Sequence, residues 1–200
     1  MNWIKRTKIV PVVRATSAEA AMRVADALVE GGINVMEITM TVPGAVDVIR
    51  ELSQRSGILV GAGTVLDPQT AQNCIEAGAQ FIVSPALNIE TVKLCERLGV
   101  LVTPGALTPT EIVAAYAAGG DVVKVFPCDA LGGATYLRSL RAPLAHIPLM
   151  PTGGVTLETI ADFIAAGAIA VGVGSALVDP KQSHDELVNR ARAFRNVIRS

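Results

Sequence analysis

Residues 77–99 read AGAQFIVSPALNIETVKLCERLG and contain one complete strand-and-helix unit. A glycine stop at Gly78 precedes an apolar run from Phe81, an amphipathic segment follows, and Gly99 closes the unit. Glycine just after the last helical turn is a common helix C-cap, so each such stop separates a helix from the next strand. The stretch therefore predicts one βα unit.

The same unit recurs along the whole chain. Apolar runs start near residues 9, 35, 59, 81, 100, 122, 147 and 170, at an average spacing of about 23 residues. Eight near-continuously apolar parallel strands, each followed by a helix, close into a barrel. An open doubly wound sheet is the alternative, but its first turn is normally glycine-rich, and residues 12–17 (VVRATS) contain no glycine. We therefore predict a single (β/α)8 TIM barrel domain over residues 1–200.

The composition narrows the partners that the protein can have. Half of the residues are hydrophobic, the net charge is −1, and the aromatic content is 4%, so nucleic acid is not expected as a partner. No uninterrupted apolar run is long enough to cross a membrane. The first residues lack the apolar segment of a signal peptide, which predicts a cytoplasmic location. Cys74, Cys95 and Cys128 are too far apart for a CxxC motif and are interpreted as reduced, mostly packing thiols.

Three charged residues lie in or at the end of strand-like runs. Lys124 stands in VVKVFP, Glu37 in VMEITM, and Arg14 ends the run IVPVVR. The alternation of side chains along a strand predicts that Glu37, Lys124 and Phe126 point into the barrel. Because an isolated buried charge is costly, these groups are expected to pair or to serve a bound anion.

Lys124 and Glu37 have two interpretations. One is a buried salt bridge without further function. The other is catalysis, because desolvation in an apolar pocket lowers the pKa of a lysine and leaves a neutral amine that can attack a ketone. The resulting iminium withdraws electrons while a nearby carboxylate moves protons, which suits cleavage of a carbon–carbon bond beside the ketone. We predict that Lys124 and Glu37 are catalytic.

A phosphate site is predicted at the loops after the seventh and eighth strands. These loops read MPTGGV and VGVGSA, and their small residues let backbone N–H groups approach a ligand. This pair of loops is the usual phosphate site of barrels. Gly153 and Gly154 are the expected backbone donors and Ser175 a hydroxyl or amide donor, although a glycine pair can also be only a tight turn.

Further candidates stand at strand ends. Thr64 is predicted to point inward with Val60 and Ala62 and to bind a substrate carboxylate beside Arg14, with a helix N-cap as the alternative role. Pro85 and Phe126 are expected to form pocket walls. Without a clustered set of histidines or carboxylates, neither a metal nor another cofactor is expected.

Several segments together resemble one known family, the KDPG/KHG aldolases, over essentially the whole chain. They are residues 31–39 (GGINVMEIT), 61–66 (GAGTVL), 81–85 (FIVSP), 123–127 (VKVFP), 151–155 (PTGGV) and 174–176 (GSA). The resemblance implies a class I aldolase that cleaves 2-keto-3-deoxy-6-phosphogluconate to pyruvate and glyceraldehyde 3-phosphate, with 4-hydroxy-2-oxoglutarate as a further substrate. It also implies that Lys124 forms the Schiff base, that Glu37 is the general base, and that the protein is a homotrimer.

The chain departs from the family at one position. Many members carry an arginine for the pyruvate carboxylate four residues after the base, where this chain has Thr41. Arg14 is the expected replacement. A 2-keto-3-deoxy-6-phosphogalactonate aldolase, a phosphate-binding barrel isomerase or synthase without an imine, and a non-catalytic assembly protein remain the alternatives.

Overall fold

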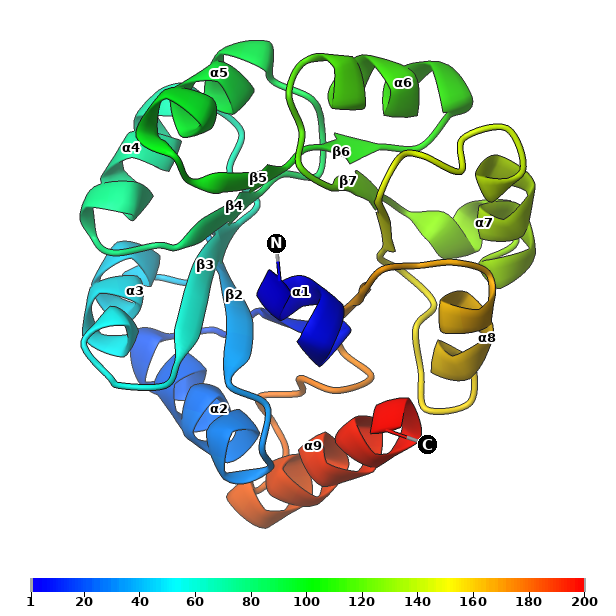
Figure 1. Ribbon diagram of the computed structural model, residues 1–200. Coiled ribbons are helices and arrows are strands. Elements are labelled where there is room, and N and C mark those ends of the chain that lie inside the picture. Colours follow the sequence, from blue (N-terminus) through cyan, green and yellow to red (C-terminus); the bar gives the residue numbers. More distant parts are fainter. Residues whose placement is uncertain (1, 200) are drawn as a thin grey trace.

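The computed structural model describes residues 2–199, and Figure 1 shows its strands inside a ring of helices. Every apolar run predicted to be a strand contains one that begins within two residues of the predicted start. The strands are β1 (Ile9–Val13), β2 (Val35–Thr39), β3 (Leu59–Gly63), β4 (Phe81–Val83), β5 (Leu101–Thr103), β6 (Gly105–Ala106), β7 (Val123–Val125), β8 (Leu149–Pro151) and β9 (Val171–Val173). The helices are α1 (Asn2–Thr7), α2 (Ala18–Glu30), α3 (Ala45–Ser53), α4 (Pro68–Glu76), α5 (Ile89–Leu98), α6 (Pro109–Ala117), the 3-10 helix η1 (Cys128–Leu131), α7 (Ala134–Arg141), α8 (Ile160–Ala165) and α9 (His184–Arg199).

The strands form two parallel sheets. The larger has the order β5-β4-β3-β2-β1-β9 and the smaller the order β6-β7-β8, while a parallel bridge between Thr152 and Gly172 connects the ends of the two. The fifth predicted strand is divided into β5 and β6 at Pro104, which has no N–H to give to a ladder. A parallel α/β architecture is thus confirmed, whereas one continuous eight-stranded barrel sheet is not.

Local sequence signals set the helix ends. Asp67 caps α4 and accepts a hydrogen bond from the Thr70 N–H, with Pro68 in the first turn. Thr108 and Glu111 form a reciprocal capping box at the start of α6. Gly99 ends α5 with φ of 66°, a left-handed conformation that glycine adopts without a steric penalty.

The predicted alternation is confirmed in β2 and around β7. Met36 and Ile38 belong to the large core between the strands and the helices, whereas Val35 points inward. The inward apolar residues form a second core, here called the inner cluster, and most of them stand at or near the start of a strand. Its buried members are Ile4, Val10, Val35, Phe81, Val83, Val122, Met150 and Ala170.

Helix α1 covers the inner cluster at the end where the strands begin, and Figure 1 shows it in the middle of the ring. Ile4 is 1% exposed, and the Trp3 ring lies 4.8 Å from the Phe81 ring, centroid to centroid. The first residues were not predicted to form a helix. Their role is to close the apolar interior at this end.

In β3 the predicted orientation is wrong. Val60 and Ala62 pack outward into the large core. The inward positions belong to Gly61 and Gly63, where an added Cβ would overlap the Phe81 ring and the Glu37 carboxylate, respectively. Two absent side chains therefore make room for two large ones. Because glycine has no side chain, the sequence pattern contains no sign of this.

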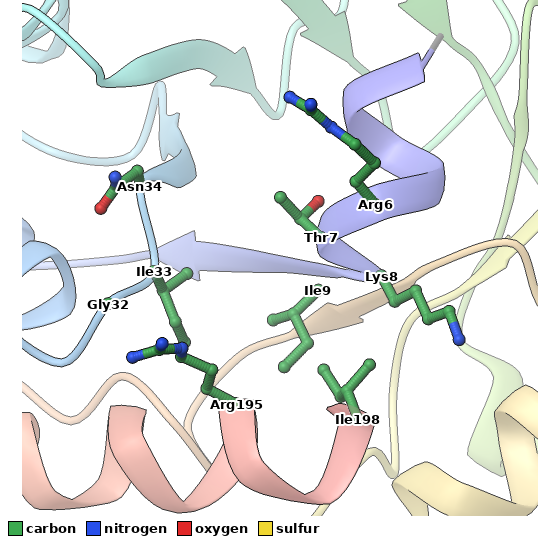
Figure 2. Close-up of a pocket in the computed structure, with 9 residues that line it drawn as sticks. All are labelled: Arg6, Thr7, Lys8, Ile9, Gly32, Ile33, Asn34, Arg195 and Ile198. Atoms are coloured by element: carbon green, nitrogen blue, oxygen red, sulfur yellow. The ribbon is translucent and has the colours of Figure 1, made fainter. Parts of the chain in front are cut away.

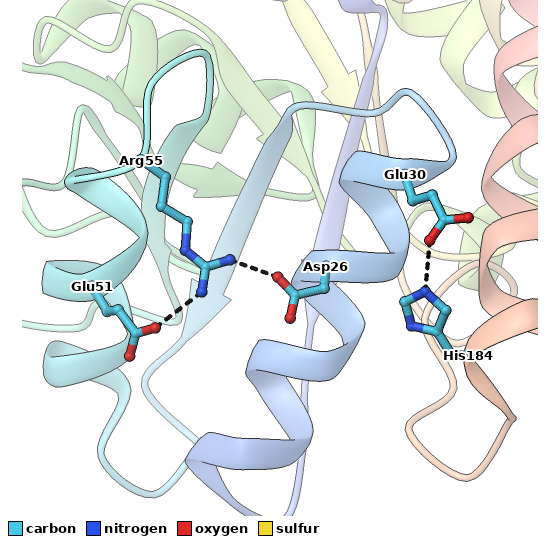
Figure 3. Close-up of polar contacts among 5 residues, drawn as sticks. All are labelled: Asp26, Glu30, Glu51, Arg55 and His184. Carbon is cyan, nitrogen blue, oxygen red and sulfur yellow. Dashed lines mark hydrogen bonds and ion pairs between the residues drawn. The ribbon is translucent and has the colours of Figure 1, made fainter.

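Exposed ion pairs connect neighbouring helices on the outer surface (Figure 3). Arg55 lies 2.6 Å from Asp26 of α2 (Nη1 to Oδ1) and 3.0 Å from Glu51 of α3 (Nη2 to Oε1). His184 Nε2 of α9 lies 2.9 Å from Glu30 Oε2 of α2. Such exposed pairs contribute little to stability, typically about 0–1 kcal/mol each.

None of the helices within residues 2–199 has the length and apolar character that a membrane-spanning helix needs.

Candidate active site

Glu37 and Lys124 meet inside the ring, as predicted. They come from the middle of β2 and of β7, and Lys124 Nζ lies 3.8 Å from Glu37 Oε1. The two side chains are only 1% and 3% exposed. This distance is that of an ion pair and is longer than a hydrogen bond. A basic and an acidic side chain are thus held close together without a hydrogen bond between them.

The Glu37 carboxylate is available for proton transfer. Neither of its oxygens accepts a hydrogen bond from the described residues. Burial raises the pKa of Glu37, because desolvation disfavours the charged carboxylate, while the positive charges of Lys124 and Arg14 oppose that rise. A buried carboxyl with free lone pairs and a raised pKa suits a group that takes up and returns a proton.

The surroundings of the pair hold it in place. Gly63 of β3 faces Glu37 so closely that any larger residue would displace the carboxylate. Lys124 Nζ lies 5.3 Å from the centre of the Phe126 ring, within the range of a cation–π contact. Thr39, the next inward residue after Glu37, donates a hydrogen bond of 3.1 Å to the Val13 carbonyl and so connects the ends of β2 and β1.

A cavity of about 350 Å³ opens where β1, β7, β8 and β9 end. It brings together five of the predicted substrate-binding residues, namely Arg14, Phe126, Gly153, Gly154 and Ser175. Gly153 and Gly154 have φ of 102° and 71°, which side chains rarely adopt, and a Cβ on either would press against Asp129. The glycine pair is therefore required by the backbone, and both glycines line a cavity that Arg14 also borders.

Phe126 links this cavity to the buried pair, since it borders the cavity and also contacts Lys124. Arg14 also links the two, because it borders the cavity and its positive charge opposes the rise that burial causes in the pKa of Glu37. The walls of the cavity do not include Thr64 or Pro85.

Thr64 and Pro85 are both half-buried just beyond strand ends. Thr64 has φ of 59°, so the strand alternation on which its orientation was predicted stops at this residue. The alternative role of Thr64 as a helix N-cap is wrong, because Asp67 caps α4. Contacts of Thr64 and Pro85 with a substrate stay predictions.

Thr152 and Asp129 are cavity residues with polar side chains that were not predicted from the sequence. Thr152 directly precedes the glycine pair and has a buried hydroxyl without a hydrogen-bond partner in the described chain, so its place at a strand end could have identified it. Asp129 brings a carboxylate against Gly153. It lies in η1, where no strand periodicity indicates which way a side chain points.

The cysteines pack, as predicted. All three are free and buried, and burial raises the pKa of each thiol to about 11, so they remain protonated at neutral pH. Cys128 Sγ lies 3.5 Å from the Gly133 carbonyl oxygen. Across the described residues 2–199, no three His, Cys, Asp or Glu side chains are grouped so that they could hold a metal ion.

Curated relatives of this chain are aldolases. A 2-dehydro-3-deoxy-phosphogluconate aldolase of Haemophilus influenzae is 37% identical over 201 residues, covering 98% of this chain and 95% of the relative. A 2-dehydro-3-deoxy-6-phosphogalactonate aldolase of Escherichia coli is 32% identical over 197 residues, covering 97% of this chain and 96% of the relative.

Solved structures share the fold. The KDPG aldolase of Legionella pneumophila, crystallised with pyruvate captured as a covalent carbinolamine intermediate, superposes with a TM-score of 0.82 at 26% identity, covering 96% of this chain and 92% of that one. The family profile for KDPG and KHG aldolases matches residues 1–193. The chain therefore belongs to the KDPG and KHG aldolase family, whose members are lyases.

Proposed function

We propose that this protein cleaves 2-keto-3-deoxy-6-phosphogluconate to pyruvate and glyceraldehyde 3-phosphate through a Schiff base on Lys124. The observation that carries the proposal is the buried pair, with Lys124 Nζ 3.8 Å from Glu37 Oε1. The covalent carbinolamine of the Legionella relative supports an imine route for the family.

The first half of the reaction builds the imine. The neutral Lys124 amine attacks the C2 carbonyl of the substrate and forms a carbinolamine. Glu37 moves a proton to the departing hydroxyl, so that water leaves and an iminium remains. The positive nitrogen now withdraws electrons from the neighbouring carbons.

The second half breaks the C3–C4 bond. Glu37, acting through a water, takes the proton of the C4 hydroxyl, the aldehyde of glyceraldehyde 3-phosphate forms, and the electron pair of the broken bond moves into an enamine. Protonation of the enamine at C3 gives the pyruvate iminium. Hydrolysis then releases pyruvate and restores the Lys124 amine, so no external oxidant, metal or cofactor enters the balance.

The cavity residues hold the substrate at its two charged ends. The phosphate lies against the backbone amides of Gly153 and Gly154 and against Ser175, in the loops that bind phosphate in many barrels. Arg14 and Thr64 hold the carboxylate, with Pro85 and Phe126 as walls of the pocket. Binding energy from the distant phosphate then helps to align the reacting carbons with Lys124 and Glu37.

The galactonate epimer is the second candidate substrate. The specific observation in its favour is Thr41, an exposed threonine where many family members have the carboxylate-binding arginine. The galactonate aldolase of Escherichia coli is also a relative over nearly the whole chain. Comparing kcat/KM for the two epimers and for 4-hydroxy-2-oxoglutarate ranks the three substrates.

The finer architecture belongs to the same proposal. We propose that the two sheets work as one (β/α)8 barrel domain over residues 1–200, with one seam at Pro104 and a second between β8 and β9. The parallel bridge between Thr152 and Gly172 and the backbone hydrogen bond from Lys124 to the Pro104 carbonyl support this. The homotrimer and the cytoplasmic location stay predictions.

The deciding experiment is trapping of the imine. The protein is incubated with pyruvate, reduced with borohydride and mapped by peptide mass, with Lys124→Met as the control variant. We expect one reduced pyruvyl adduct, on the peptide that contains Lys124. A folded protein that gains no adduct, or gains it on another lysine, would overturn the Schiff-base mechanism and favour the imine-free isomerase or synthase, whereas an adduct without turnover of any of the three substrates would favour the assembly protein.

A further inference from the structure

A second cavity lies at the opposite end of the strands and has no part in the proposed chemistry (Figure 2). This cavity, here called the lower pocket, measures about 260 Å³ and lies between the end of α1, the start of β1, the loop before β2 and the last turns of α9. Its lining residues are Arg6, Thr7, Lys8, Ile9, Gly32, Ile33, Asn34, Arg195 and Ile198. Ile9 begins β1 and Arg14 follows its end, so roughly 16 Å of strand separates the lower pocket from the active-site cavity.

The charge of the lower pocket is entirely positive. Arg6, Lys8 and Arg195 line it, and none of its described lining residues is acidic. Within residues 2–199, these three side chains make no hydrogen bond and no ion pair, in contrast to Arg192 on the same helix α9, which lies 3.7 Å from Glu30. Three cations around one cavity without a counter-charge repel one another, and a bound anion would remove that repulsion.

Arg195 gives the strongest sign of a missing acceptor. Its Nε is buried and has no partner in the described chain, and a buried donor without an acceptor is costly. The guanidinium group lies against Gly32, where an added Cβ would overlap it. In Figure 2 the Arg6 guanidinium lies beside α1 at the top of the view, the Arg195 guanidinium lies beside α9 at the lower left, and the Lys8 ammonium points to the right.

We infer that the lower pocket is a binding site for a compact phosphate-bearing anion, independent of the proposed aldolase reaction. Arginine forms paired hydrogen bonds with phosphate oxygens, and the pocket is lined by Arg6 and by Arg195, whose buried Nε has no acceptor in the described chain. The volume is below that of most drug-sized ligand sites, which fits a small ligand.

Inorganic pyrophosphate is the probe for the test. Titration of the full-length protein is followed by the NMR shifts of backbone amides, which separate the two ends of the molecule. We expect saturable shifts at Lys8, Ile33 and Asn34, in addition to any shifts at Gly153 and Ser175 in the active-site cavity. Shifts confined to the active-site cavity would overturn the inference.

Variants identify the side chains that bind. Arg195→Gln should weaken pyrophosphate binding at the lower pocket about tenfold or more, because a charge-assisted bond is lost. Arg192→Gln removes a cation from the same helix outside the pocket and should leave the affinity unchanged. Arg6→Gln provides a second test on an exposed residue, in case Arg195→Gln does not fold. Equal affinity in the Arg6→Gln and Arg192→Gln variants would contradict the inference.

Discussion

The interior of the ring has two layers that differ in chemistry. From the middle of the strands to their ends, Glu37, Thr39 and Lys124 form a buried polar layer beside a cavity rich in glycine. Near the beginnings of the strands, the inner cluster is purely apolar and is closed by Ile4 and Trp3. Burial of the polar layer destabilises the folded state through desolvation, whereas burial of the apolar layer stabilises it. Stability and chemistry are therefore assigned to opposite ends of the same strands.

The largest expected effect is that of removing the amine. Lys124→Met should lower kcat for cleavage of 2-keto-3-deoxy-6-phosphogluconate by on the order of 10⁴-fold or more, because the covalent route is lost. Steady-state kinetics measures the loss, and circular dichroism confirms the fold. Lys93→Met, at an exposed lysine paired with Glu90, is the matched control and should retain full activity. Comparable activity of the two variants would remove Lys124 from the mechanism.

The apolar layer should respond in stability alone. Ile4→Ala leaves a cavity under the inner cluster and should lower the free energy of unfolding by about 3 kcal/mol. Urea denaturation measures this change in stability. At a temperature 10 °C below the thermal midpoint of the variant, where it is folded, the rate of pyruvate trapping by borohydride should equal that of the unmodified protein. Val113→Ala, at an exposed position on α6, should change neither quantity. A large loss of trapping rate in folded Ile4→Ala would show that the two layers are not independent.

The two inward glycines of β3 contact one layer each, since Gly61 lies against Phe81 and Gly63 against Glu37. Gly63→Ala should therefore affect activity. The added methyl group overlaps the Glu37 carboxylate, and a displacement of about 1 Å at a catalytic group can lower the rate about 100-fold. Kinetics with the preferred epimer measures this. Gly57→Ala, in open space with φ of 80°, strains the backbone far from the site and should reduce stability without reducing kcat. A Gly63→Ala enzyme with unchanged kcat would mean that Glu37 does not need its present position.

The smallest expected effect is a shift of the pH profile. Glu37 must be deprotonated to act as a base, and desolvation raises its pKa above the ordinary value of 4.5, so the acid limb of kcat should lie above pH 4.5. The Arg14 charge stabilises the carboxylate, so Arg14→Gln should raise the pKa further and move the acid limb to higher pH. Arg14→Lys keeps the charge and should restore the original limb. An acid limb that stays in place or moves to lower pH in Arg14→Gln would exclude this coupling.

Much of the candidate active site could be predicted from the sequence because its signals are local. A charged residue inside an apolar strand is conspicuous, and the two-residue period of a strand fixes the side to which it points, which is why Glu37 and Lys124 were found. The glycine pair at residues 153–154 stands at a strand end that barrels use for phosphate. These inferences need only the neighbouring residues.

The remaining features depend on contacts between distant segments. Gly61 and Gly63 point inward because Phe81 and Glu37 need the space, and neither need can be read from β3 itself. The division of β5 from β6 follows from Pro104, and its effect on the ladder depends on the hydrogen-bonding groups of the adjacent strands. The lower pocket was missed entirely, since three segments far apart in sequence form it and no periodic pattern marks their ends.

The position of Trp3 has a practical consequence. It is the single tryptophan of the chain, and its ring packs on Phe81 at the apolar end, next to the α1 residues that line the lower pocket. The tryptophan emission of the whole protein therefore originates at the end away from Lys124. Loosening of α1 can be followed as a red shift of that emission without any label, while the substrate site contributes no tryptophan signal of its own.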